Sequence, residues 1–332
     1  MERAVIHTDL KLEEIQPSAL LGQYLSLLED DIRKHFAEVS LHETFCPVSG
    51  EKEVQHSFLK LGMEYRVSRS LGNIYLSPRP GMEVLKKFYM ESKAREFWLA
   101  ECWSQTMKTR EDKIILPQLE WVQGFISQYY SGDQLNLAEF MSNHWGYYKM
   151  AEKVFPNFDY SLIAPLFDPT LVDDLIGIKT ADHVDNDSQD AVLLFEALDR
   201  SPDPLGLLKI VNQALKPGGL CFVNCLLTSG FEVLVLGEKS GIFVPPERMN
   251  LFSFEGMNML IKKIGGLEVL EFSTPGVLDI PNVINKLDDV EYDSFFNYLF
   301  KLRQDPLLVE SFQNFLQLNR LGGFGRLVLR KL

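Results

Sequence analysis

The chain has 332 residues, a length that favours about two domains. Its 33 basic and 46 acidic side chains give a formal net charge of −13, which argues against a nucleic-acid-binding protein, because such a protein needs a basic face. Hydrophobic residues make up 46% and charged residues 24%, so a large core is expected and disorder of the bulk is excluded. We find no run of 18 apolar residues and no signal-peptide pattern at the N-terminus, so we expect a cytoplasmic protein that does not enter a membrane.

The first 130 residues predict three parts in chain order. Residues 1–44 form a helical extension, because apolar positions recur every three or four residues from Pro17 to about Val39. This helix either packs on its own domain or forms a homodimer or binds a protein partner. Residues 45–81 are β-rich and turn-rich. Residues 82–130 predict a helical linker that carries no obvious catalytic group.

Residues 131–332 show a different sequence pattern, in which short apolar runs alternate with segments of helical periodicity. This alternation predicts βαβ units and a parallel sheet covered on both faces. The expected fold class is therefore α/β, with a doubly wound, mostly parallel, Rossmann-like sheet beside the N-terminal helical and small β-rich regions. The expected strands are residues 135–141, 160–167, 191–195, 220–226, 267–272 and 325–329, and the expected helices include one that ends at Phe155 and residues 205–215, 255–264, 292–303 and 306–318.

The four cysteines predict no disulfide framework. Cys221 and Cys225 fall in one expected strand, where four residues span roughly 13 Å, too far for two thiolates to hold one metal ion. We interpret them, with Cys46 and Cys102, as small buried side chains.

Ligands of a doubly wound sheet bind outside the carboxyl ends of its strands. Three segments fall there: residues 137–146, which follow the first strand of this region; Phe167-Asp168-Pro169 at the expected end of the second; and the stretch that begins at Asp190. A carboxylate at Asp168 is suited to accept hydrogen bonds from ribose hydroxyls, and its alternative role is to cap a helix that starts near Thr170.

The run DAVLLFEALDRSPDPLGLLKIVNQALKPGGLCFV (190–223) resembles the fourth-strand region of class I S-adenosylmethionine-dependent methyltransferases. The downstream run at 230–276 and the segment CPVSGEKEVQHSFLKLGMEYRVSRSLGNIYLSPRP (46–80) are similar to a bacterial branch with an N-terminal zinc ribbon. The resemblance covers about residues 45–330. It implies S-adenosylmethionine as cofactor and Glu139, Gly146, Asp168, Phe195 and Glu196 as cofactor-binding positions.

Two motifs of that family are degenerate here. The ribbon expects four cysteine ligands, but only Cys46 is present, and Ser49, Ser68 and Leu71 occupy the other positions. Serine and leucine cannot replace thiolates around zinc, so no zinc and no other metal is expected.

The second degenerate motif is the glycine-rich loop, whose glycines let the cofactor approach the backbone. With Glu139 as its acid, Met141, Asn143 and Trp145 stand at the glycine positions. With Gly146 as the last glycine, Ser142 and His144 stand at the other two. Both registers leave side chains where the cofactor is expected. Trp145 is therefore interpreted as a pocket plug or core residue, with substrate stacking as the alternative.

Several residues have a structural and a functional interpretation. Glu139 is either an acid near the cofactor amine or a buried, hydrogen-bonded carboxylate. His144 is a weak candidate for a catalytic base, since histidine titrates near neutral pH, with polar surface as the alternative. Glu247-Arg248 is either part of a substrate lid or a surface ion pair. The acids Asp182, Asp185, Asp187 and Asp190 match no calcium loop and predict a solvated face.

Two functions follow from the resemblance. The first is an enzyme that transfers a methyl group from S-adenosylmethionine to a small molecule, such as a sugar or an intermediate of secondary-metabolite biosynthesis. The second is a pseudoenzyme, a methyltransferase-like scaffold that no longer binds the cofactor and serves as an interaction protein or uses the cavity for other chemistry. Fold alone does not decide between them.

Overall fold

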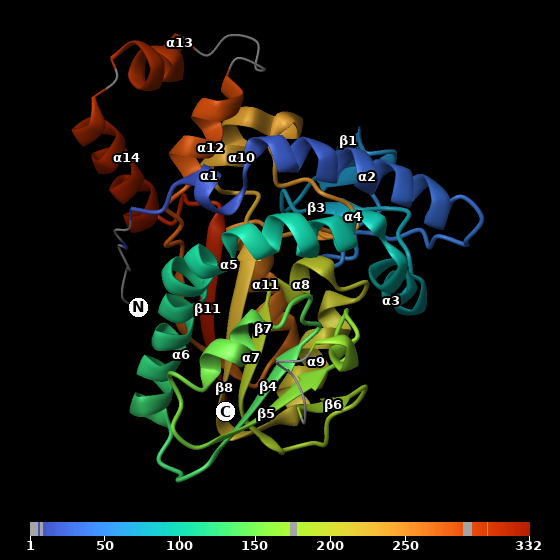
Figure 1. Ribbon diagram of the computed structural model, residues 1–332, viewed down its shortest axis with the longest axis vertical. Coiled ribbons are helices and arrows are strands. Elements are labelled where there is room, and N and C mark those ends of the chain that lie inside the picture. Colours follow the sequence, from blue (N-terminus) through green and yellow to red (C-terminus); the bar gives the residue numbers. More distant parts are fainter. Residues whose placement is uncertain (1–5, 7–8, 173–177, 288–293, 304) are drawn as a thin grey trace.

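The computed structural model describes residues 1–332 except 1–5, 7–8, 173–177, 288–293 and 304. Its central element is a seven-stranded sheet in the order β10–β11–β8–β7–β4–β5–β6 (Figure 1). Strand β11 runs antiparallel to both of its neighbours, and the pairs from β8 to β6 are parallel. The strands are β4 (Leu135–Phe140), β5 (Phe158–Ile163), β6 (Lys179–Ala181), β7 (Gln189–Phe195), β8 (Leu215–Leu226), β10 (Leu267–Ser273) and β11 (Phe324–Lys331). The predicted doubly wound, mostly parallel α/β fold is confirmed.

Helices cover both faces of this sheet because its central strands are apolar on both sides. Successive residues of β4 point to opposite faces. Leu137 packs in one core with helix α6 (Leu116–Tyr129), whereas Ala138 packs in a second core with α9 (Pro204–Ala214) and α11 (Phe254–Ile264). A third core joins the helices α10 (Phe231–Leu236), α12 (Asp279–Lys286) and α14 (Pro306–Leu318) with the π-helical turn η7 (Asn297–Leu302), and α13 (Ser294–Phe296) packs against it.

The small β-rich segment forms one sheet with a strand of the larger domain. Its antiparallel strands are β1 (Val54–Lys60), β2 (Met63–Ser68) and β3 (Ile74–Leu76), and β3 pairs with β9 (Asn250–Leu251). Arg79 of the Pro-Arg-Pro tail reinforces this joint. Its buried guanidinium donates to Asn250 Oδ1 at 2.7 Å and to the Pro202 carbonyl at 3.3 Å. The predicted segment 45–81 is therefore tied to the Rossmann-like domain by backbone and side chain.

Hydrogen bonds connect the positions that a zinc ribbon would use for metal. Cys46 Sγ accepts from the Ser49 backbone at 3.5 Å and from Asn73 Nδ2 at 3.6 Å. Ser68 Oγ donates to Glu51 Oε1 at 2.7 Å, and the same carboxylate oxygen accepts from the Ser70 backbone at 3.1 Å. Within the described residues, no group of three or more His, Cys, Asp or Glu side chains is arranged to hold a metal ion.

The N-terminal helices lie across the edge of the sheet toward which the parallel strands run (Figure 1). Helix α2 (Ser18–Phe36) uses its apolar face, with Leu28 and Ile32 buried, to pack within this chain. Its buried Asp31 accepts from Ser92 Oγ at 2.7 Å and from the Ala94 backbone at 2.8 Å. The remaining segments of this region are α1 (Leu12–Ile15), α3 (Met82–Glu91), α4 (Lys93–Phe97), the π-helical turns η1 (Trp98–Trp103) and η2 (Glu111–Ile115), and α5 (Ser104–Arg110).

Three element boundaries differ from the sequence prediction. Strand β5 ends at Ile163, because Ala164 adopts a left-handed φ of 46° and Pro165 follows it. Strand β8 begins at Leu215, five residues before the expected start at 220, and the helix after β4, α7 (Gly146–Ala151), ends before Phe155. The expected helix 292–303 begins outside the described residues. No described helix is both long and apolar enough to cross a bilayer.

Candidate functional site

The carboxyl ends of β4, β5, β7 and β8 meet beneath the N-terminal helices (Figure 1). Ligands of doubly wound sheets bind at this edge, and each predicted site residue lies on a strand end or loop along it.

Glu139 is buried at the end of β4 and is held by two hydroxyl groups. Ser142 Oγ donates to Oε1 and the Tyr160 hydroxyl donates to Oε2, each at 2.6 Å. Burial raises the pKa of Glu139 to about 7, although both hydroxyl groups act to lower it. Both carboxylate oxygens are therefore engaged inside the protein, as in the structural interpretation of this residue.

The loop after β4 carries side chains at the positions where the family has glycines. Met141 is 1% exposed and packs in the core beside α9, yet its φ is 51°, a conformation that favours glycine. Trp145 is half-buried, with its ring 6.1 Å from that of Phe167. Gly146 begins α7 and is buried against Ile115 and Trp103, so that an added Cβ would lie 2.6 Å from Ile115 Cδ1.

His144 lies between two aromatic rings, with centroids 4.4 Å from Trp103 and 5.2 Å from Tyr147. Burial lowers the pKa of His144 to about 3, so the ring is neutral near pH 7. Nδ1 accepts from the Gly146 backbone at 3.2 Å. In a neutral imidazole the other nitrogen then carries the proton, so Nε2 is a hydrogen-bond donor rather than a base.

Asp168 lies five residues beyond the end of β5 and caps a short 3₁₀ turn, η3 (Pro169–Leu171). Oδ1 accepts from the Thr170 backbone at 2.9 Å and from the Thr170 hydroxyl at 2.6 Å. Thr170 thereby lowers the pKa of Asp168. The capping alternative is realised with Oδ1 alone, and Oδ2 accepts no hydrogen bond from the part of the chain that the structure describes.

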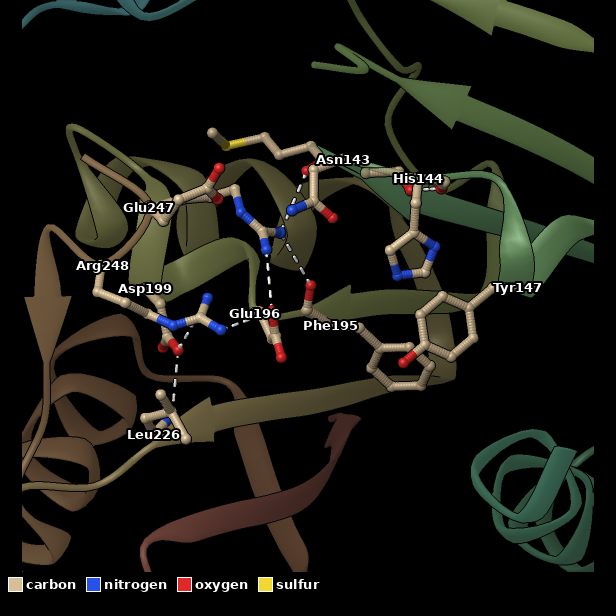
Figure 2. A network of polar contacts seen from close by, with 12 residues as sticks. Asn143, His144, Tyr147, Phe195, Glu196, Asp199, Leu226, Glu247 and Arg248 are labelled. Atoms are coloured by element: carbon tan, nitrogen blue, oxygen red, sulfur yellow. Dashed lines mark hydrogen bonds and ion pairs between the residues drawn. The ribbon is translucent and has the colours of Figure 1, made fainter. Parts of the chain in front are cut away.

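Glu196 follows β7 in a left-handed conformation, with φ of 56°, which turns its carboxylate toward two arginines. Oε2 accepts from Arg200 Nη2 at 3.0 Å and from Arg248 Nη2 at 2.9 Å (Figure 2). Burial raises the pKa of Glu196, but Arg248 and Arg200 outweigh it and hold the pKa at about 2. The ring of the preceding residue, Phe195, lies 4.6 Å from that of Tyr147.

Asp199 extends this network to β8. Its Oδ2 accepts from the Leu226 backbone at 3.1 Å and lies 3.9 Å from Arg248 Nη1 (Figure 2). The side chain is fully buried, and burial raises the pKa of Asp199 to about 7 even though Arg248 lowers it.

One sequence interpretation is wrong. Glu247 and Arg248 do not form a surface pair with each other: Arg248 turns inward to Glu196, and Glu247 accepts from the Tyr89 hydroxyl at 2.7 Å. The helical segment 82–130, in which the sequence shows no obvious catalytic group, brings Tyr89 and Arg95 to this edge, and Arg95 is 7% exposed and donates to the Asn143 carbonyl. Arg95 lies between Lys93 and Glu96 in a charged stretch of sequence, so no local signal set it apart.

The four acids at 182–190 are not a cluster. Asp182, Asp187 and Asp190 pair separately with Lys86, Lys331 and Lys216, each at 2.8 Å or less. Two small cavities lie away from the edge just described. One of about 200 Å³ includes Phe58 and Phe243, and one of about 180 Å³ adjoins the segment 216–220.

No family model and no curated protein matches the chain. Solved structures of methyltransferases are similar to it at low identity. The plantazolicin methyltransferase BpumL in complex with S-adenosylhomocysteine is 11% identical, over 75% of this chain and 95% of that one, with a TM-score of 0.44. A chain from the complex of the Haloferax volcanii methyltransferase activator Trm112 with a methyltransferase is 14% identical, over 70% and 95%, with a TM-score of 0.43. A Mesorhizobium loti S-adenosylmethionine-dependent methyltransferase is 15% identical, over 64% and 98%, with a TM-score of 0.38. At these values the likeness assigns no activity, cofactor or substrate.

Proposed function

We propose that this chain is a methyltransferase-like protein that binds S-adenosylmethionine at the carboxyl edge of its sheet and transfers the methyl group to a small molecule, such as a sugar or secondary-metabolite intermediate. The observation that supports it is the position of Phe195 and Glu196 at the end of β7, next to β4 with Glu139. The fourth-strand resemblance assigns these residues to the cofactor. The cofactor would supply an activated methyl group, and the chain would contribute mainly alignment.

The two ends of this site fit the cofactor unequally. Asp168 has Oδ2 available for ribose hydroxyls, as the proposal requires. The loop after β4 does not fit in this conformation, because the buried Met141 side chain stands at a glycine position. This second observation favours the alternative, a scaffold that does not bind the cofactor and serves as an interaction protein or uses the site for other chemistry.

Calorimetric titration of the purified chain with S-adenosylmethionine and S-adenosylhomocysteine separates the two candidates. Methyl transfer requires saturable binding of both, with a dissociation constant in the micromolar range and a rise in Tm, because a ligand that binds the native state stabilises it. If millimolar ligand gives neither heat nor a thermal shift, methyl transfer is excluded and the scaffold function remains. A protein partner or second copy at the N-terminal helices also stays a proposal, to be tested by the mass of the particle in solution.

A further inference from the structure

Three arginines from separate parts of the chain gather at the carboxyl ends of the neighbouring strands β4 and β7. Arg200 donates from Nη1 to the Phe195 carbonyl at 3.3 Å and to the Met141 carbonyl at 3.5 Å. Arg248, which precedes β9, shares Glu196 with it. Arg95 comes from α4 and donates to the loop after β4. The acids Glu196, Asp199 and Glu247 lie in the same network (Figure 2), so charges of both signs meet here.

These guanidinium groups hold more donors than the protein satisfies. Arg200 is 1% exposed, and among the described residues its Nε has no hydrogen-bond partner; the same holds for Arg248 Nη1, which lies 3.9 Å from Asp199 Oδ2. Arg95 makes one hydrogen bond within the described residues and otherwise lies over the Tyr89 ring, 5.2 Å from its centroid. Trp103 adds an unpaired buried Nε1 beside His144.

Unpaired buried donors are costly, and native proteins keep few of them. A ligand that supplies acceptor oxygens would satisfy them. The planar guanidinium fork matches carboxylate and phosphate oxygens, and hydrogen bonds to such charged groups are the strong ones. The network has one unpaired acceptor as well, Asp199 Oδ1, which fits a hydroxyl or amine donor on the same ligand.

These groups adjoin the expected cofactor region, because Glu196 is one of the positions that the resemblance assigns to the cofactor, and they extend from it toward β8. Glu139 lies within β4 and Asp168 beyond β5, whereas Arg200 and Arg248 surround Glu196 and Asp199 at the ends of β7 and β8, where Leu226 ends its strand (Figure 2). Glu247 faces the same space, held by Tyr89 from α3.

We propose that Arg95, Arg200 and Arg248 bind an oxyanion, a carboxylate or a phosphate, on the small molecule that this site accepts. The inference rests on the proposed function and names its substrate class. Glu196 holds Arg200 and Arg248 in place in the free protein, and the ligand oxygens take the donors that remain.

The test uses the full chain and two probes, phenyl phosphate and benzoate, with phenol and benzamide as uncharged controls, in calorimetric titrations. Wild-type protein should bind at least one oxyanion probe and neither uncharged control, and the preferred probe distinguishes phosphate from carboxylate. Arg248→Gln and Arg95→Gln should each weaken that probe by about tenfold or more, the range for charged hydrogen bonds. Arg248→Lys keeps the charge but loses the planar guanidinium fork, so its affinity for that probe should lie between those of wild type and Arg248→Gln. The control is Arg33→Gln, on a side chain that is 70% exposed.

Circular dichroism of each variant checks folding. If Arg248→Gln does not fold, the probe affinities of Arg95→Gln and Arg248→Lys test the proposal instead. Probes that do not bind wild type, or that bind every folded variant equally, overturn the proposal. A parallel titration with S-adenosylhomocysteine keeps the two inferences apart: its failure with intact probe binding removes the methyltransferase but not the oxyanion site. If Arg248→Gln weakens S-adenosylhomocysteine but not methylthioadenosine, which lacks the amino-acid part, the oxyanion belongs to the cofactor and the substrate assignment is overturned.

Discussion

Arg248 meets Glu196 across 52 residues of sequence, with 2.9 Å between Nη2 and Oε2. The same carboxylate oxygen accepts from Arg200, so one side chain joins the turn after β7 to the segment before β9. Arg79 donates to Asn250 of β9, and β9 pairs with β3. The segment from Arg248 to Asn250 therefore connects the small sheet to the network around Glu196.

We expect Glu196→Gln to lower the free energy of unfolding by about 2 kcal/mol at pH 7, the range for hydrogen bonds to charged groups. The folded pKa of about 2 lies below the ordinary 4.5, so this contribution is fully present above about pH 4.5 and is lost as the pH falls toward 2. Urea unfolding of both proteins between pH 2.5 and 7 measures it. Glu120→Gln, on the exposed side of α6, should change little, and a pH-independent difference at Glu196 would contradict the ion-pair account.

His144 should stay neutral through the range in which free histidine titrates. Its folded pKa of about 3 lies below the ordinary 6.5, so the unfolded chain binds the proton first. Its contribution to stability is full above about pH 6.5 and declines as the pH falls from there toward 3. The His144 ring proton resonance, assigned by comparison with His144→Gln, should not shift between pH 5 and 8. A titration midpoint near 6.5 would restore the catalytic-base hypothesis.

Replacing Met141 should separate burial from backbone strain. Met141→Ala removes a buried side chain and should cost about 2–5 kcal/mol. Met141→Gly should cost about 1 kcal/mol less, since glycine adopts the observed φ of 51° without a Cβ penalty. Thermal and urea unfolding give both values, and Met259→Ala, on a side chain that is 37% exposed, is the control. Greater stability of the alanine variant would show that the loop is not held in this conformation.

If the cofactor binds, Asp168→Ala should weaken S-adenosylhomocysteine by about 10- to 150-fold, because ribose hydroxyls would lose a charged acceptor. The matched control is Asp203→Ala, which removes another capping carboxylate, the acceptor of the Gly206 backbone at 2.9 Å. Both variants should lose a comparable, small amount of stability. Calorimetry then assigns any loss of affinity to Asp168 itself. Unchanged affinity in folded Asp168→Ala would leave this residue as a cap only.

Metal analysis of the purified chain should find less than one zinc per molecule, because Ser49, Ser68 and Leu71 cannot supply thiolates beside Cys46. A chelator should not change Tm, since the segment 45–81 is held by hydrogen bonds such as that from Ser68 to Glu51. One tightly bound zinc per chain, with unfolding by chelator, would mean that these four positions are not the counterparts of the ribbon ligands.

The fold class could be read from local patterns. Apolar runs at β4, β7 and β8, separated by helical periods, require a sheet buried on both faces, and this requirement depends only on neighbours along the chain. The same local rules placed α9, α11 and α14 within a residue or two. They failed at the end of β5, where the left-handed Ala164 breaks the strand inside an apolar run.

The site itself depended on contacts between residues far apart in sequence. Sequence patterns and the family resemblance identified Glu139, Asp168 and Glu196 as candidates, but only tertiary structure brought Arg95 to the loop after β4 and Arg248 to Glu196 after β7. A charged side chain in a sequence is expected in solvent, because burying an unpaired charge is prohibitive. Whether a partner exists is decided by how distant segments pack, and here that packing turned an expected surface pair into a buried network.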